Sequence, residues 1–273
     1  MKELIVRAVS GVLYVALFIL SLQSQHLLIG LFFVFGLICI AEFNKLINQK
    51  GISSYIIFII SYLTFSYWQL MLANSEGFDE AIQILHVLTI FVMLFLIKDL
   101  FSKKKLPLLI NNKYIKTTLY LSSSFIFIIL IANYHETFNT NILLGSFILV
   151  WVNDSFAYLV GKNFGKQKLF PSISPKKTVE GFLGGLLFAC ISSYFIAKYT
   201  NTLGSTEWLI LAIIVSVFGT LGDLIESKYK RQANVKDSGV IMPGHGGLLD
   251  RLDSIIFAAP FIYLFLRILK YFS

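Results

Sequence analysis

The chain has 273 residues, of which 56% are hydrophobic and 14% are charged, and its mean hydropathy is +0.76. Soluble domains usually contain about 25% charged residues, so this composition excludes an ordinary soluble domain and places the chain among integral membrane proteins. The formal net charge of +8 does not indicate a nucleic-acid partner, because the cytoplasmic loops of membrane proteins are themselves enriched in Lys and Arg.

Nine apolar segments are each close to the length of about 20 residues that a helix needs to cross a bilayer. They cover residues 5–22, 27–47, 55–72, 81–100, 116–133, 142–161, 181–199, 208–225 and 255–271. The first lacks the cleavage site of a signal peptide, so we expect it to be retained. The predicted fold class is therefore an all-α integral membrane protein, a polytopic bundle of about nine transmembrane helices.

Basic residues are distributed unevenly between the two ends of these segments. If the N-terminus is cytoplasmic, 20 of the 23 Lys and Arg residues lie on the cytoplasmic side, and Lys198, Arg267 and Lys270 lie outside. This asymmetry predicts an N-in, C-out topology. The lysines at 103–105 are interpreted as part of the same topogenic bias, with attraction to anionic lipid as the alternative.

The two halves of the chain differ in the chemistry they offer. Residues 1–140 contain little besides spans, and Glu42, at the end of the second span, is interpreted as an interfacial charge. We expect this half to be a scaffold that contacts lipid or a second copy of the chain. Residues 141–273, with predicted cytoplasmic loops at 161–180 and 226–253, form the predicted catalytic region.

An acidic residue, Asp154, interrupts the sixth apolar segment. Ionisable residues inside a span are costly and usually face a polar interior. Asn153 and Tyr158 could share its helical face, since Asp154 and Tyr158 are four residues apart. A functional carboxylate and a buried, hydrogen-bonded structural one are both compatible with this pattern.

The loop after this segment contains Ser174-Pro175 followed by Lys176 and Lys177. Ser before Pro is typical of a helix start, which would place both lysines in the first helical turn. Lysine there is unfavourable to the helix dipole unless an anion such as phosphate is bound; an ordinary basic loop is the alternative. The glycines at 181, 184 and 185 are expected to allow close helix packing.

A stripe of acidic and basic residues lies at the end of the eighth segment. Asp223, Glu226, Ser227 and Lys230 are spaced to line one face of a helix, and Asp250 and Asp253 share a face at the start of the last one. Carboxylates that converge beside lysines predict a Mg²⁺ site in which phosphates complete the coordination. The sequence therefore favours phosphoryl or nucleotidyl transfer at the cytoplasmic membrane face.

A glycine-rich stretch, Pro243 to Gly247, separates these two acidic pairs and contains His245. Glycine allows the main chain to approach a ligand closely. A single histidine is more often structural than a ligand, but in this loop His245 could also contact phosphate or donate a proton. Both interpretations stay open on the sequence alone.

Three blocks of sequence resemble the phosphatidate cytidylyltransferase (CDP-diacylglycerol synthase) family. From Ser227 to Asp253 the chain reads S-K-Y-K-R-x4-K-D-S-G-x3-P-G-H-G-G-L-L-D-R-L-D. The earlier blocks read N-D-S-F-A-Y-L-V-G-x3-G-K and S-P-K-K-T-V-E-G. The similarity covers residues 154–253, whereas the first half resembles the family only in having serial spans.

The resemblance implies that CTP and phosphatidate are converted to CDP-diacylglycerol and pyrophosphate in phospholipid biosynthesis. It implies dependence on Mg²⁺, with room for a second, monovalent cation such as K⁺. It also implies a homodimer in the bacterial plasma membrane, with membrane lipid around it and the active site on the cytoplasmic face.

The resemblance also assigns roles to residues of this chain. Asp223 and Asp250 would be the principal metal ligands, with Asp253 and Asp154 in support. The implied catalytic set is Asp223, Asp250, Lys236, His245 and Arg251. The implied substrate-binding set is Ser174, Lys176, Lys177, Ser227, Lys230, Arg231, Asp237, Gly246 and Gly247.

Two other functions use part of the same pattern. A CTP-dependent polyprenol or dolichol kinase would transfer the γ-phosphoryl group and release CDP rather than pyrophosphate. An ion-coupled transporter would use Asp154 and Asp223 as intramembrane ion sites, but transporters usually place such sites near the midplane. The polar residues here gather at one face, which favours an enzyme.

Overall fold

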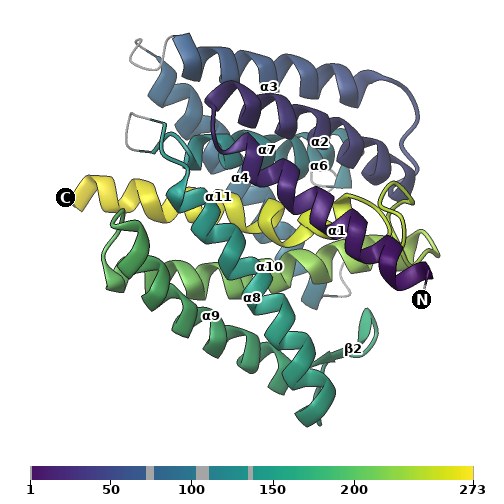
Figure 1. The fold of residues 1–273 in the computed structure, drawn as a ribbon. Helices are drawn as coiled ribbons and strands as arrows, with labels where there is room; N and C mark the ends of the chain where they lie inside the picture. The colour runs from purple at the N-terminus through teal and green to yellow at the C-terminus, as the bar shows by residue number, and fades with distance from the viewer. Residues whose placement is uncertain (1, 72–76, 103–110, 135–137, 273) are drawn as a thin grey trace. The chain divides into compact units, whose positions relative to one another are not determined.

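The computed structural model describes residues 2–71, 77–102, 111–134 and 138–272, and the described chain is almost entirely helical (Figure 1). The three lysines at 103–105 lie outside the described residues. The elements are α1 (Lys2–Ser21), α2 (Gln25–Leu46), α3 (Ser53–Met71), α4 (Phe78–Phe101), α6 (Lys113–Lys116), η1 (Thr117–Ser122), α7 (Ser123–Ile131), α8 (Asn141–Phe164), β1 (Lys168–Phe170), β2 (Ser174–Thr178), α9 (Val179–Thr200), α10 (Ser205–Gln232) and α11 (Leu249–Phe272).

The predicted class, an all-α polytopic membrane protein, is confirmed. Within the described residues, seven helical stretches are long and apolar enough to cross a membrane: α2, α4, the run Lys113–Ile131, α8, α9, α10 and α11. α1 and α3 contain shorter apolar stretches, Val6–Ser21 and Ser53–Ser66. Each predicted segment thus falls on a helix, while nine crossings and the N-in, C-out topology stay predictions.

The chain forms two compact units, and the glycine-rich stretch belongs to the first of them. The first unit comprises Met1–Leu130 and Tyr229–Leu252, and the second comprises Ile131–Lys228 and Asp253–Ser273. The end of α10, the loop that follows and the first turn of α11 therefore pack with the N-terminal helices. The predicted functional division at residue 140 instead groups the glycine-rich stretch with the C-terminal half of the chain, residues 141–273.

Aromatic side chains hold the end of α10 to the N-terminal helices of the first unit. The ring of Phe43 on α2 lies 5.5 Å from that of Tyr120 and 5.2 Å from that of Tyr229, both edge-on. Tyr120 belongs to the π-helical turn η1, and Tyr229 directly precedes Lys230 on α10. Edge-to-face aromatic pairs add to the energy of burial, so α2 supports the start of the loop.

Close packing of α8 against α9 dominates the second unit, where the two helices run side by side (Figure 1). A Cβ atom on Gly181 would lie 2.7 Å from the carbonyl oxygen of Ala157, and one on Gly185 would lie 2.6 Å from that of Asn153. Gly184 is similarly crowded by Val160. The predicted role of these three glycines in helix packing is confirmed.

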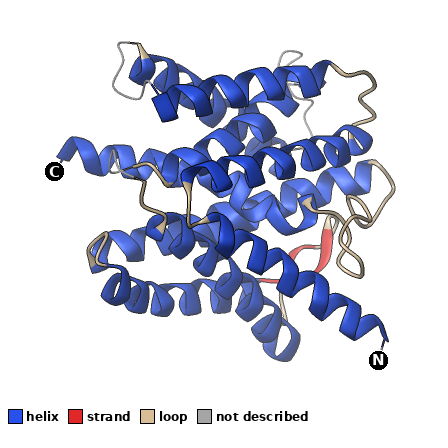
Figure 2. Ribbon diagram, turned by 45° about the horizontal axis from the view of Figure 1, so that its top comes forward, coloured by secondary structure: helices blue, strands red, loops and turns tan. Residues whose placement is uncertain are grey.

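The predicted helix start at Ser174-Pro175 is wrong. Residues Ser174–Thr178 form β2, which pairs antiparallel with β1 in a short hairpin (Figure 2). α9 begins at Val179, with the Thr178 hydroxyl accepting a hydrogen bond from the Gly181 N–H at 3.1 Å. Starting there puts Glu180 rather than two lysines into the first turn, which suits the helix dipole. Lys176 and Lys177 therefore belong to a strand, and the helix-terminus argument for a bound anion does not apply to them.

Helices α10 and α11 both extend beyond their apolar segments, as the spacing of their polar residues predicts. α10 continues to Gln232, seven residues past the apolar segment that ends at 225, and α11 begins at Leu249, before the apolar segment that starts at 255. In the second unit, Gly222 lets the two helices approach closely, since a Cβ atom there would lie 2.5 Å from Cβ of Phe257 and 2.8 Å from the Asp253 carbonyl oxygen. The polar residues after the apolar run of α10 and before that of α11 therefore both lie on helix.

Candidate functional site

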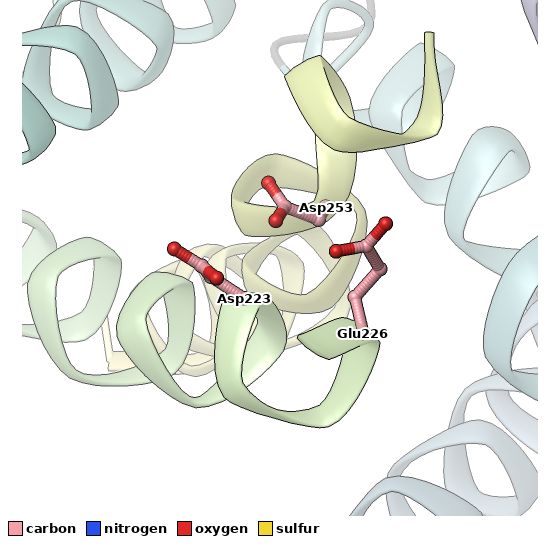
Figure 3. Close-up of side chains that lie close together, drawn as sticks. All are labelled: Asp223, Glu226 and Asp253. Carbon is pink, nitrogen blue, oxygen red and sulfur yellow. The ribbon is translucent and has the colours of Figure 1, made fainter. Parts of the chain in front are cut away.

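Three carboxylates meet between α10 and α11 in the second unit. Asp223 and Glu226 come from α10 and Asp253 from α11, and one oxygen of each lies within 4.8 Å of the others. Figure 3 shows the three side chains gathered between the two helices. The close approach at Gly222, next to Asp223, is what brings α11 near enough for Asp253 to join them.

The surroundings of these carboxylates suit a cation. Glu226 and Asp253 are buried, at 0% and 7% exposure, and the Asp223 side chain is 30% exposed. Ionised carboxylates this close repel one another unless a cation or a proton lies between them. Mg²⁺ prefers oxygen ligands and is commonly held by one or two carboxylates together with phosphate oxygens. The donor set therefore fits Mg²⁺, with Asp223 as the ligand most open to a substrate.

A lysine and a hydroxyl lie against Asp223. Nζ of Lys177, on β2, is 2.5 Å from Oδ2 of Asp223, and Oγ of Ser227 donates to Oδ1 at 3.2 Å. The Lys177 side chain is 28% exposed. The hairpin thus places an ammonium group beside the carboxylates, where phosphate charge would accumulate.

Asp154, the predicted supporting ligand, is exposed on α8 and is not part of this group among the described residues. Its Oδ1 accepts from Nδ2 of Asn153 at 3.3 Å. Asn153 is buried while Asp154 and Tyr158 are exposed, so Asn153 does not share their face. Tyr158 instead contacts Lys162, whose Nζ lies 5.8 Å from the ring centroid.

Asp250 holds the loop between α10 and α11, here called the glycine-rich loop, in the first unit. Its Oδ1 accepts from Nζ of Lys230 at 2.6 Å, within a pair of buried side chains. Its Oδ2 accepts from the backbone N–H groups of Ser238, at 2.9 Å, and Gly247, at 2.7 Å. Asp250 belongs to the first unit and the group of Asp223 to the second, so the predicted role of Asp250 as a principal metal ligand stays a prediction.

Two glycines of this loop are required by the backbone itself. Gly244 and Gly246 have φ values of +76° and +90°, which residues with a Cβ atom rarely adopt. The turn between them is closed by hydrogen bonds from the His245 N–H to the Met242 carbonyl oxygen and from the Met242 N–H to that of Gly246, both 2.9 Å. The tight turn therefore explains these two glycines without any need for a bound ligand.

His245 is held by residues from both ends of the first unit. Its Nδ1 is hydrogen-bonded to Oγ of Ser10 on α1 at 2.8 Å, and its carbonyl oxygen accepts from Nη2 of Arg251 at 3.1 Å. Partial burial, together with the positive charges of Arg251 and Arg7, holds the pKa of His245 below its ordinary value. The contacts hold the imidazole in the loop, and its predicted role in contacting phosphate or donating a proton stays a prediction.

This lowered pKa predicts an acid-sensitive contribution to stability. The unfolded chain binds a proton at this site more readily than the folded one, so the contribution is present above the unfolded pKa, about 6.5, and is lost as pH falls toward the folded value. We expect the thermal unfolding midpoint of the wild type to fall more between about pH 7.5 and pH 5.5 than that of His245→Asn. Equal slopes in a pH series of unfolding scans would contradict this expectation.

The other predicted binding residues are scattered over exposed positions. Arg231 donates from Nη1 to the Val235 carbonyl oxygen at 3.1 Å, which caps the end of α10. Ser174 pairs with Phe170 across the hairpin. The side chains of Lys176, Arg231, Lys236, Asp237 and Arg251 are exposed. Their roles in substrate binding stay predictions.

The structure gives two acidic residues, Glu226 and Glu42, positions that the sequence did not predict. Glu226 was placed on the polar stripe of α10 but not among the metal ligands, although it is three residues from Asp223. Glu42 was interpreted as an interfacial charge, but it is 2% exposed and binds the glycine-rich loop. The spacing on α10 could have identified Glu226, whereas nothing near Glu42 in the sequence indicates its partners.

Comparison with known proteins gives a consistent result. The sequence model of the "Cytidylyltransferase family" matches residues 5–269. The chain is 36% identical to the phosphatidate cytidylyltransferase of Bacillus subtilis over 209 residues, which cover 74% of this chain and 76% of the relative. It is 32% identical to that of Staphylococcus epidermidis over 273 residues (96% and 98%), and 48% identical to that of Staphylococcus aureus over 126 residues (45% and 48%).

Proposed function

Because this chain belongs to the cytidylyltransferase family, we propose that it transfers the cytidylyl group of CTP to phosphatidate, forming CDP-diacylglycerol and pyrophosphate. The chain is a nucleotidyltransferase of phospholipid biosynthesis, as relatives aligned over nearly its whole length are. The observation that carries the proposal is the meeting of Asp223, Glu226 and Asp253 beside Lys177. Such a site suits two anionic substrates.

Asp223 and Asp253 would hold Mg²⁺, with Glu226 behind them. Bound there, the metal would draw charge from the phosphates of CTP and so ease attack on them. Asp223 is the most exposed of the three, so it faces the nucleotide, while the buried Glu226 and Asp253 keep the ligand oxygens in place. The Ser227 hydroxyl, which donates to Asp223, orients that carboxylate.

The basic side chains reduce repulsion between the reactants. Lys177 is paired with Asp223 and is placed to transfer this contact to a phosphate oxygen when substrate arrives. The phosphate of phosphatidate is already ionised at neutral pH, so no general base is needed to form the nucleophile.

The membrane location of the reaction is proposed from the composition of the chain and from its relatives. The apolar helices make this an integral membrane protein, and the named relatives are bacterial. The excess of Lys and Arg on one side supports a cytoplasmic active site in the plasma membrane. A homodimer and a second, monovalent cation such as K⁺ are proposed from the resemblance alone.

The decisive experiment is product analysis with the purified protein in detergent. Incubation with CTP labelled at the α-phosphorus, phosphatidate and Mg²⁺ should yield a labelled lipid and free pyrophosphate. In a parallel incubation with polyprenol in place of phosphatidate, labelled CDP together with an unlabelled polyprenyl phosphate would identify a CTP-dependent kinase instead. Ion flux in liposomes without CTP, and no lipid product, would identify a transporter.

Replacement of Lys177 tests the role of the hairpin. Lys177→Ala should lower kcat/KM for CTP by about 10- to 100-fold, because a charge-assisted contact to phosphate is lost. Lys168→Ala is the matched control, since Lys168 is an exposed lysine on β1 of the same hairpin; its change should stay within about twofold. The measurement is the initial rate over a series of CTP concentrations. Similar losses of kcat/KM in both variants would show that Lys177 contributes only through the general positive charge of the hairpin.

A further inference from the structure

Glu42 is a buried carboxylate near the end of α2, far in sequence from the predicted catalytic region. Its side chain is 2% exposed, and three donors of the first unit point at it. The Leu248 N–H donates to Oε1 at 3.2 Å, the Leu249 N–H to Oε2 at 2.8 Å, and the Ser238 hydroxyl to Oε2 at 3.1 Å. An interfacial charge would instead be solvated, so Glu42 has a specific structural partner in the loop.

The two backbone donors belong to the point where the loop becomes helix. Leu249 is the first residue of α11, and N–H groups in a first helical turn have no partner within the helix. A carboxylate there satisfies these donors and interacts favourably with the helix dipole. Glu42 therefore caps the start of α11.

Two glycines of the loop are explained by the same carboxylate. A Cβ atom on Gly239 would clash with Oε1 of Glu42, and one on Gly247 would clash with Oγ of Ser238 and lie 2.5 Å from Oε2 of Glu42. Neither glycine has a positive φ, so the backbone conformation alone does not require them. They allow the loop to close around Glu42.

Ser238 connects Glu42 to Asp250. Its hydroxyl lies 3.1 Å from Oε2 of Glu42 and 3.1 Å from Oδ2 of Asp250, and its N–H donates to the same Asp250 oxygen. One loop residue is thus clamped by a carboxylate from α2 and a carboxylate from α11. Lys236 and Asp237 directly precede Ser238, and Gly246 and Gly247 lie further along the loop; all four are candidate catalytic or substrate-binding residues.

We propose that Glu42 is a positioning residue of the transferase, which holds the loop from Ser238 to Leu249 in the conformation that receives CTP. This role rests on the proposed function. The exposed charged side chains of Lys236 and Asp237, directly before Ser238, are the groups of this region that we assign to the charged nucleotide. Glu42 acts through the loop and does not itself contact the nucleotide.

Glu42→Gln tests the proposal in two ways. The amide places an NH₂ group where a carboxylate oxygen now accepts N–H donors, so amide hydrogen exchange in a peptide spanning residues 244–250 should become about tenfold faster. The KM for CTP should rise about tenfold while that for phosphatidate changes by about twofold or less. A purely structural defect would lower the active fraction and leave both KM values unchanged.

Two further variants test whether the effect of Glu42→Gln comes from the lost carboxylate charge or from the loss of any buried hydrogen bond on α2. Glu42→Asp keeps the charge on a shorter side chain and should recover part of the wild-type KM. Asn44→Ala, on the same helix, removes a buried bond from Nδ2 to the Ser54 hydroxyl without touching the loop, and should leave loop exchange and both KM values near wild type. If Glu42→Gln does not fold, Ser238→Ala replaces it and should shift loop exchange and the KM for CTP in the same direction.

The outcomes are separable. Exchange and KM values equal to wild type in Glu42→Gln, with an active wild type, overturn the role of Glu42 alone. Faster exchange with an unchanged KM for CTP also overturns it, because the loop conformation would then not matter to the nucleotide. A wild-type protein that forms no CDP-diacylglycerol overturns the proposed function itself, and with it any catalytic meaning of Glu42.

Discussion

Replacing Asp223 with Asn should reduce CTP-dependent formation of lipid product by about 10³-fold or more. The change is isosteric, but it removes the charge of the most exposed carboxylate in the group formed with Glu226 and Asp253. A neutral amide is a weaker ligand for Mg²⁺ and gives Lys177 no charged partner. The rate of appearance of labelled CDP-diacylglycerol at saturating CTP is the measurement that checks this result.

A binding readout separates loss of the metal from loss of the fold. Mg²⁺ that binds the folded state should raise the thermal unfolding midpoint of the wild type, and should raise that of Asp223→Asn much less. Glu207→Gln, at the other end of α10, is the matched control and should behave as wild type. Wild-type turnover in Asp223→Asn would remove this carboxylate from the proposed site.

Replacing Asp250 with Asn should both destabilise the protein and remove its activity. Lys230 and Asp250 are a buried pair, with side chains 11% and 6% exposed, and breaking such a pair by removing one charge typically costs about 3–5 kcal/mol. The Asn side chain would also lose one of the acceptor oxygens that bind Lys230, Ser238 and Gly247. We expect a lower unfolding midpoint in detergent together with loss of product.

The companion variant Lys230→Met shows which half of this pair matters more. It leaves Asp250 bound to the loop N–H groups, so we expect its midpoint to fall less than that of Asp250→Asn. If Asp250→Asn keeps the wild-type midpoint and still loses all turnover, the structural account of Asp250 fails. The residue would then act directly on metal or substrate, as the resemblance implies.

The helical spans were predictable because each depends on a local run of apolar residues. Their polar ends were predictable from helical spacing, since Asp223 to Lys230 and Asp250 to Asp253 were expected on helix, and α10 continues to Gln232 while α11 begins at Leu249. The hairpin Lys168–Thr178 was missed because Ser174-Pro175 is also a good helix start. Pairing with β1 and capping by Thr178 decided between the two, and neither is visible in a local pattern.

The site was predictable where helical periodicity determines it. Asp223 and Asp253 were expected to converge, and both lie in the same group of carboxylates. Glu42 was not predictable as a loop anchor, because its backbone partners are more than 200 residues away along the chain. Contacts of this kind appear only when the fold is known, while the reaction was indicated by the motifs from Ser227 to Asp253.

The clamp formed by Glu42 has an evolutionary consequence. Position 42 and the small residues at 239 and 247 occupy one shared volume, so a change at any of them requires compensation at the others. Chimaeras between relatives that join at the middle of the chain would split this set between two parents. Such hybrids should succeed only when the donor of the amino-terminal helices brings an acid of matching length.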